Sequence, residues 1–339
     1  MWVVLFHIAM WAPGAHPHIP IISRGYIAVD FFFILSGFIL ARAHAWQFSK
    51  YHWANHLNFV LKRFLRLFPL HWAALATLVA VMAIQGTPLY WRGYIIDEAL
   101  LVHRWGFSHS PHAVINGPDW SISTEWAANL LYPIFIWLIM GSRIKAGLAI
   151  VSAIGLLLYV VASNGWSLDF SFARSLIPLM RCFAEFALGV SVYRYRSYSA
   201  HWATDRILGT LLAIDLFLIT MPSTDILVVA TIPFLILGLS ASNQRIAAVL
   251  ASKPLHWLGT VSYSIYLIQY PVILLSLWFT SKITNMNVRE FSFPFVVIFL
   301  ILIVSHFTYR FIEVKARRVF GKFTETLRRN RTPTMAASP

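Results

Sequence analysis

Charged residues are scarce in this sequence. Only 12% of its 339 residues are Asp, Glu, Lys or Arg, whereas 58% are hydrophobic. An ordinary soluble domain carries about 25% charged residues. The composition therefore excludes a typical soluble protein and predicts an all-α, multi-pass membrane protein.

Acidic residues and cysteine are especially few. Lys and Arg number 27 against 13 Asp and Glu, which gives a formal net charge of +14. Nucleic-acid binding would require basic residues gathered on a soluble surface. Here they form short clusters between apolar runs, so we interpret them as topology signals and as contacts for lipid or anions. The single cysteine, Cys182, excludes an intrachain disulfide and is predicted to be a buried thiol.

Long apolar runs predict about ten membrane spans, because a spanning helix needs about 20 mostly apolar residues. The candidate spans are roughly 1–12, 26–42, 64–85, 121–141, 146–163, 174–193, 206–221, 225–241, 255–280 and 293–312. The first is too short to cross a bilayer, so we expect the chain to begin partway through a helix. One integral-membrane domain over 1–320 and a basic, disordered tail over 321–339 are predicted.

Lys and Arg in the connections predict the orientation of the spans. With the N-terminus placed in the cytoplasm, 20 of the 27 Lys and Arg fall on the inside, 6 fall outside, and Arg181 lies within a span. This bias predicts a cytoplasmic C-terminus.

Three ionisable residues are predicted at one depth in the first, second and fourth spans. His7 lies near the outer end of its helix, and Asp30 and Glu125 lie near the outer starts of theirs. At 1.5 Å per residue, all three are roughly 6–8 Å below the outer surface. A neutral imidazole accepts a proton from a hydroxyl, and a carboxylate on its other nitrogen fixes its tautomer. The three residues therefore form a candidate catalytic group, in which Asp30 or Glu125 orients His7. The alternative is that they pair only to hold the helices together.

A basic cluster of Lys62, Arg63 and Arg66 is predicted at the inner end of the third span. Arg63 and Arg66 share one helix face, and two guanidiniums there suit the binding of phosphates. A positive-inside anchor that binds lipid headgroups is the alternative.

Polar side chains within the apolar segments predict a substrate cavity. We assign to it Ser36, Trp120, Tyr263, Tyr266 and Gln269. His16 and His18 in the first outer loop have no suitably spaced carboxylate or cysteine beside them, so no metal site is predicted.

Six segments carry a resemblance to a known family. They are VVLFH at 3–7, GYIAVDFFFILSGF at 25–38, KRFLRLFPL at 62–70, WSISTEWAANLLYP at 120–133, LGTVSYSIYLIQYP at 258–271 and YRFIE at 309–313. Together and in this order they resemble the acyltransferase 3 family of bacterial integral-membrane acyltransferases. That family includes O-antigen, exopolysaccharide and nodulation-factor O-acetyltransferases.

The resemblance implies about ten transmembrane helices in the bacterial inner membrane. It also implies transfer of an acyl group, usually acetyl, from cytoplasmic acyl-CoA to a hydroxyl, commonly on a glycan, with no permanently bound cofactor. His7 matches the family's essential histidine, Asp30 and Glu125 match its motif acids, and Arg63 and Arg66 match an arginine motif with a proposed role in donor binding. On this reading His7 is the general base; an acyl-histidine intermediate is the variant mechanism.

Three departures from the family pattern are visible. No residue precedes Met1 to supply the basic residue usual about ten positions before the histidine. Gln269 stands where the family usually has His, so it is not assigned a base role, and the segment IEVK at 312–315 lacks a common proline. A proton-coupled transporter, with the three ionisable residues as a relay, and an inactive scaffold relative are the competing functions.

Overall fold

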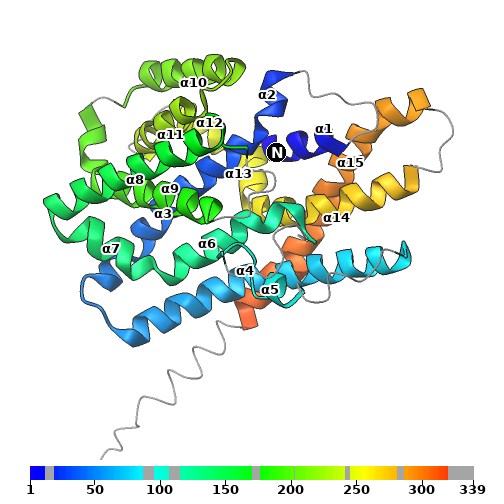
Figure 1. The fold of residues 1–339 in the computed structure, drawn as a ribbon, viewed down its shortest axis with the longest axis horizontal. Helices are drawn as coiled ribbons and strands as arrows, with labels where there is room; N and C mark the ends of the chain where they lie inside the picture. The colour runs from blue at the N-terminus through cyan, green and yellow to red at the C-terminus, as the bar shows by residue number, and fades with distance from the viewer. Residues whose placement is uncertain are drawn as a thin grey trace, which may run out of the picture.

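The computed structural model describes residues 1–11, 19–86, 95–106, 115–169, 176–201, 203–240, 245–280 and 286–319. The regular structure in these ranges is helical (Figure 1), which confirms the all-α prediction. The predicted tail over 321–339 and the two histidines His16 and His18 lie outside the described residues.

In the described ranges, ten larger helices and several shorter ones form the bundle. The larger helices are α1 (Trp2–Trp11), α3 (Ala28–His44), α4 (Trp53–Ile84), α6 (Trp120–Leu130), α7 (Tyr132–Gly141), α8 (Arg143–Ser163), α9 (Ile177–Arg194), α10 (Asp205–Thr220), α11 (Asp225–Ser240), α14 (Ser262–Thr280) and α15 (Met286–Thr308), counting the bent pair of α6 and α7 as one. The shorter ones are α2 (Pro20–Ser23), α5 (Ile95–Ala99), α12 (Arg245–Leu250) and α13 (Lys253–Thr260).

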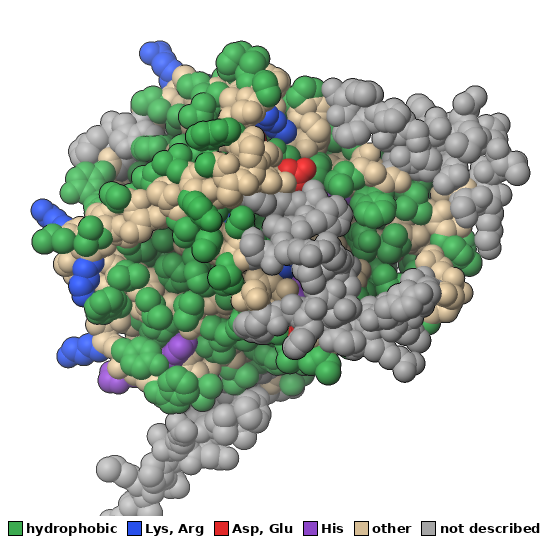
Figure 2. All heavy atoms as spheres, in the orientation of Figure 1, with side chains coloured by type: hydrophobic (Ala, Val, Ile, Leu, Met, Phe, Trp, Pro, Cys, Tyr) green, Lys and Arg blue, Asp and Glu red, His purple; other side chains and the backbone are tan. Residues whose placement is uncertain are grey.

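Each predicted span overlaps a helix or a bent helix pair. By length and composition, five described helices are able to cross a membrane, and six if α6 and α7 form one bent span. Helices α1 and α11 are apolar but shorter. Hydrophobic side chains cover much of the face in Figure 2, and several Lys and Arg side chains lie along its left edge. The chain is a multi-pass membrane protein.

Helix α4 begins earlier than predicted. The apolar run suggested a start near residue 64, but the helix starts at Trp53 and continues through Pro69 to Ile84. Arg63 is therefore about 15 Å along the helix axis from Trp53, not at the helix end. The prediction that the basic cluster marks the inner end of the helix is wrong, because polar residues before it are also helical.

The fourth predicted span is broken. Helices α6 and α7 meet at Leu131 with a bend of 61°. Pro133 explains the break, since a proline ring inside a helix removes a hydrogen bond and clashes with the preceding turn. The His56 Nε2 donates a hydrogen bond to the Leu130 carbonyl oxygen at 3.0 Å and so satisfies a backbone group there.

Helices α3 and α9 pack against each other at backbone contact in the core. A Cβ on Gly37 would lie 2.2 Å from the Phe186 carbonyl oxygen, and one on Gly189 would lie 2.0 Å from that of Ile34. Small residues let membrane helices approach to backbone contact. This pairing fixes α3, which carries two of the predicted site residues, Asp30 and Ser36.

Candidate functional site

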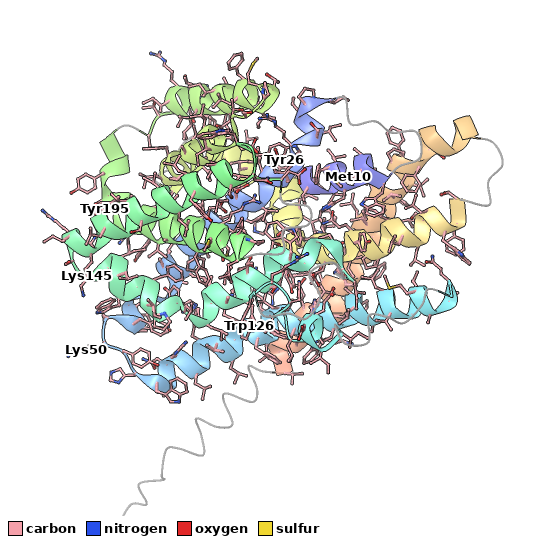
Figure 3. All side chains as sticks on the ribbon, viewed as in Figure 1. Met10, Tyr26, Lys50, Trp126, Lys145 and Tyr195 are labelled. Atoms are coloured by element: carbon pink, nitrogen blue, oxygen red, sulfur yellow. The ribbon has the colours of Figure 1, made fainter. Side chains whose placement is uncertain are left out.

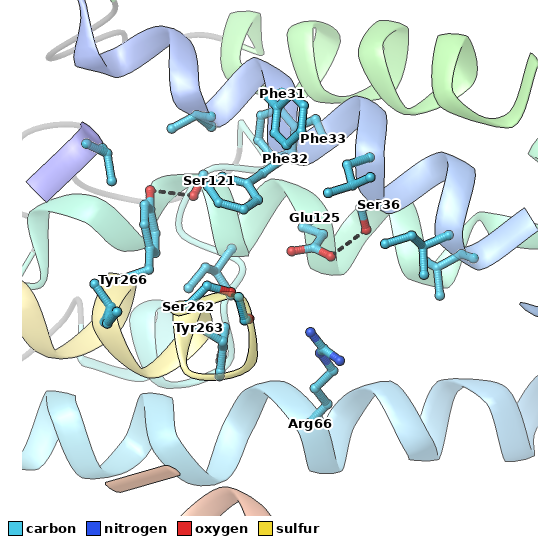
Figure 4. Close-up of a pocket in the computed structure, with 18 of the residues that line it drawn as sticks. Phe31, Phe32, Phe33, Ser36, Arg66, Ser121, Glu125, Ser262, Tyr263 and Tyr266 are labelled. Carbon is cyan, nitrogen blue, oxygen red and sulfur yellow. Dashed lines mark hydrogen bonds between the residues drawn. The ribbon is translucent and has the colours of Figure 1, made fainter. Parts of the chain in front are cut away.

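A cavity of about 570 Å³ lies between helices α3, α4, α6, α13 and α14 and the start of α1 (Figure 4). Apolar side chains from α3 and α14, including Phe31, Leu35 and Ile265, make up most of its wall. Its polar lining residues are Ser36, Arg63, Arg66, Ser121, Glu125, Ser262, Tyr263 and Tyr266. An apolar pocket with a few convergent polar groups is the usual form of a small-molecule site.

Ser36, Glu125 and Arg63 form the charged end of this cavity. The Ser36 hydroxyl donates to Glu125 Oε1 at 2.8 Å (Figure 4), and Arg63 Nη2 donates to the same oxygen at 3.2 Å. The three residues come from α3, α6 and α4. Glu125 is thus paired with a neighbouring arginine, and sequence depth alone did not predict this contact.

Arg66 lies one turn beyond Arg63 on α4 and points into the cavity (Figure 4). No ion pair involves Arg66 within the described ranges, although Arg63 has one. Lys62, the third member of the predicted basic cluster, is exposed and is not part of the cavity wall. The cavity therefore offers one guanidinium, that of Arg66, which no carboxylate of the described residues engages.

Tyrosines on α14 shape the rest of the wall. The hydroxyls of Tyr266 and Ser121 lie 2.7 Å apart, and Tyr266 also donates to the Pro118 carbonyl oxygen at 2.6 Å. Tyr263 donates to the Leu67 carbonyl oxygen at 2.6 Å. These bonds hold the start of α6 and the middle of α4 against α14.

His7 lies just beyond the cavity wall. It follows the lining residue Val3 by four positions on α1, about 6 Å along the helix. Its partner is Gln269, whose Oε1 lies 3.1 Å from His7 Nδ1. The Gln269 Nε2 donates to the Tyr266 carbonyl oxygen at 3.0 Å, which turns Oε1 toward the imidazole.

The Gln269 contact selects one form of a neutral His7. Because Oε1 accepts only, Nδ1 carries the hydrogen and Nε2 keeps the lone pair. The sequence assigned this orienting role to Asp30 or Glu125, but Gln269 performs it. An amide fixes the tautomer without adding the negative charge that a carboxylate would contribute.

Asp30 has a different partner from the one predicted. Its Oδ1 accepts from Arg181 Nε at 2.7 Å and its Oδ2 from Arg181 Nη2 at 2.6 Å, all within the buried core. Arg181 also donates to the Leu168 carbonyl oxygen, and its Nε lies 3.5 Å from Glu185 Oε1. The sequence analysis placed Arg181 within a span but predicted no partner for it. A buried arginine requires a carboxylate to neutralise its charge, and Asp30 is that carboxylate.

A second buried polar cluster lies in the connection between α4 and α6, and sequence reasoning missed it. The Glu98 carboxylate on α5 accepts from the backbone N–H groups of Ile115 and Asn116 at 2.9 and 2.7 Å. Burial raises the pKa of Glu98 to about 8, and the nearby Asp119 carboxylate acts in the same direction. The connection is thereby fastened to the residues just before α6.

Two histidines complete that cluster. His103 Nε2 lies 3.3 Å from Asp119 Oδ1, and His71 Nδ1 lies 3.6 Å from Asp119 Oδ2. The other His71 nitrogen, Nε2, donates to the Glu98 carbonyl oxygen at 2.8 Å. Burial lowers the pKa of His103 to about 4, so this imidazole is neutral near pH 7. Asp119 directly precedes Trp120, so the cluster sets where α6 begins.

A family model of an acyltransferase domain, that of acyltransferase 3, matches residues 1–310. The chain belongs to this family. No solved structure matches it.

Relatives of this acyltransferase 3 chain have names of two kinds. It is 24% identical to the peptidoglycan O-acetyltransferase OatA of Listeria monocytogenes over 93% of this chain and 54% of that protein. It is also 24% identical to the putative peptidoglycan O-acetyltransferase YrhL of Bacillus subtilis, over 93% of this chain and 52% of that protein. The acyltransferase MdmB of Streptomyces mycarofaciens is 25% identical over 75% of this chain and 69% of that protein. The chain spans about half the length of the two peptidoglycan relatives.

The structure brings part of the sequence-predicted site of this acyltransferase 3 chain together. Six predicted residues line the cavity: Ser36, Arg63, Arg66, Glu125, Tyr263 and Tyr266. Five are not among the lining residues: His7, Asp30, Lys62, Trp120 and Gln269. Trp120, predicted to line it, instead packs edge-on against Phe33, with the Arg181 guanidinium 5.4 Å from its ring centroid.

Proposed function

We propose that this protein is a membrane-bound O-acyltransferase. It moves an acyl group, acetyl in the first instance, from acyl-CoA to a hydroxyl of a cell-surface or exported glycan. The chain belongs to the acyltransferase 3 family, and its cavity is the observation that carries the proposal. In this cavity Arg66 has no ion-pair partner among the described residues, and the bonded pair of Ser36 and Glu125 lines the same wall.

The donor binds at the Arg66 end of the cavity. A guanidinium with free donors suits the diphosphate of CoA, because paired hydrogen bonds to phosphate match its planar geometry. Arg63 is held by Glu125 and so contributes less to phosphate binding. The apolar walls of Phe31, Leu35 and Ile39 accommodate the pantetheine arm and acyl group.

The acceptor hydroxyl binds at the His7 end. With Nδ1 donating to Gln269, the imidazole presents Nε2 as a base for the hydroxyl proton. The printed names of two relatives include peptidoglycan, which makes a peptidoglycan sugar the first acceptor to test.

We infer that the donor end faces the cytoplasm of a bacterium, in its inner membrane. Three connections that the charge bias predicts to be cytoplasmic lie toward one end of the molecule (Figure 3). They are marked there by Lys50, Lys145 and Tyr195. This clustering supports one common side of the membrane for these three connections, and the cytoplasmic C-terminus stays a prediction of the charge bias.

Transfer of labelled acetyl from acetyl-CoA to cell-wall glycans tests the function, in membranes that contain the full chain. We expect base-labile label on the glycan that is absent from membranes without the chain. If the inserted and folded protein neither released CoA nor transferred label to the glycan, the proposal would be contradicted.

A further inference from the structure

Three serines line the cavity, and their hydroxyls have different partners. Ser121 contacts the Tyr266 hydroxyl, and Ser262 donates to the Gly259 carbonyl oxygen at 2.8 Å. Ser36 donates to a carboxylate, Glu125, at 2.8 Å. Ser36 is thus the cavity serine whose proton faces a base.

We propose that Ser36 is a nucleophile that takes the acyl group from the donor thioester and holds it as an ester before transfer to the acceptor. This inference rests on the proposed function. It replaces one direct transfer with two successive displacements at one carbonyl carbon.

The arrangement around Ser36 has the three parts of an activated nucleophile. Nucleophile and base are within hydrogen-bond reach, and a third group orients the base: Arg63 Nη2 donates to Glu125 Oε1 at 3.2 Å. Each of these groups lines the cavity.

In the first step, Glu125 accepts the proton of the Ser36 hydroxyl as Oγ bonds to the thioester carbonyl carbon. The bond from that carbon to sulfur then breaks, and CoA leaves as a thiolate. A thiolate is a good leaving group because the pKa of an ordinary thiol is only about 8.5.

In the second step, the acceptor oxygen bonds to the acyl carbon while His7 takes its proton. The bond from that carbon to Ser36 Oγ breaks, and Glu125 returns its proton to Oγ. The proton released by His7 and the departed thiolate together make the neutral CoA thiol, so atoms and charge balance.

The test is covalent labelling of the full-length protein in detergent or nanodiscs with radiolabelled acetyl-CoA and no acceptor. We expect one burst of CoA release, up to one equivalent per protein, and label that survives denaturation and is removed by hydroxylamine. Mass spectrometry of the wild-type protein should place the acetyl group on Ser36. Ser36→Ala should remove the label, whereas Ser191→Ala, a buried serine of α9 bonded to its own helix, should keep it.

His7→Ala gives an independent check, because it should still become labelled and should hold the label longer when acceptor is added. Three outcomes would overturn the Ser36 proposal and leave the acyltransferase function intact. They are acetyl transfer without a labelled intermediate, label on another residue, and full transfer by Ser36→Ala. Absence of both CoA release and transfer in the wild-type protein would overturn both. Because the label is mapped in the wild-type protein, the test does not depend on the folding of Ser36→Ala.

Discussion

The Arg63 guanidinium lies 3.2 Å from the Glu125 carboxylate, inside the wall of the cavity. This ion pair makes the two cavity arginines unequal. Arg63 is committed to a carboxylate, and Arg66, one turn further along α4, is available to a ligand.

Arg66→Ala should therefore weaken donor binding. Loss of charged hydrogen bonds to phosphate, each worth about 1.5–3 kcal/mol, should raise KM for acetyl-CoA by about 10-fold or more. Steady-state kinetics in membranes, with donor and acceptor varied separately, measure this effect. Arg143→Ala, at an exposed arginine outside the cavity, is the matched control. A change confined to the acceptor KM would contradict the assignment.

His7→Ala should abolish most transfer without loss of the folded protein. Removal of a general base lowers kcat by about 10²–10⁴-fold. Transfer of labelled acetyl to glycan measures the loss, and size-exclusion chromatography checks the fold. His256→Ala, at an exposed histidine of α13, should leave the rate unchanged. Near-normal transfer by His7→Ala would exclude the base role.

Asp30→Ala should destabilise the bundle. It leaves Arg181 buried without its main partner, and breaking a buried ion pair costs about 3–5 kcal/mol. Glu185→Gln should be much milder, because the Glu185 oxygens accept no hydrogen bond in the described structure and Arg181 keeps Asp30. Thermal unfolding in detergent compares the two; equal losses of Tm would contradict this account.

Glu98 should make stability fall as the pH rises from neutral to mildly alkaline values. Its folded-state pKa of about 8 lies above the ordinary value of 4.5. The unfolded chain therefore binds fewer protons than the folded one between these values, and unfolding becomes easier with rising pH. His103 has the opposite effect on stability, because its folded-state pKa of about 4 lies below the ordinary value of 6.5. That effect is confined to pH values below 6.5. Between pH 6.5 and 8, Tm should fall in the wild-type protein and fall less in Glu98→Gln; parallel slopes would rule out this role.

Gly37→Ala should destabilise the contact between α3 and α9. The new methyl group would meet the Phe186 carbonyl oxygen at 2.2 Å, a backbone atom that cannot rotate away. Gly147→Ala in α8 is the control, since nothing lies within 4 Å of its new Cβ. Alanine there should be neutral or stabilise by up to about 1 kcal/mol. Equal Tm values for the two variants would show that α3 and α9 separate readily.

The amino-acid sequence by itself determined the membrane-spanning all-α class and the family. Apolar runs and charge scarcity are local properties, and six motifs in order identify the family without any contact being known. The sequence also placed Ser36, Arg63, Arg66 and Glu125 among the site residues, and these four line the cavity.

Only the tertiary structure decided which polar groups are partners. Equal depth along a helix says nothing about the direction in which a side chain points. His7, Asp30 and Glu125 therefore looked like one group, yet they contact Gln269, Arg181 and Arg63 respectively. Partner choice depends on how α1, α3 and α6 rotate and pack, and packing joins residues that are 62, 151 and 262 positions apart in these three pairs.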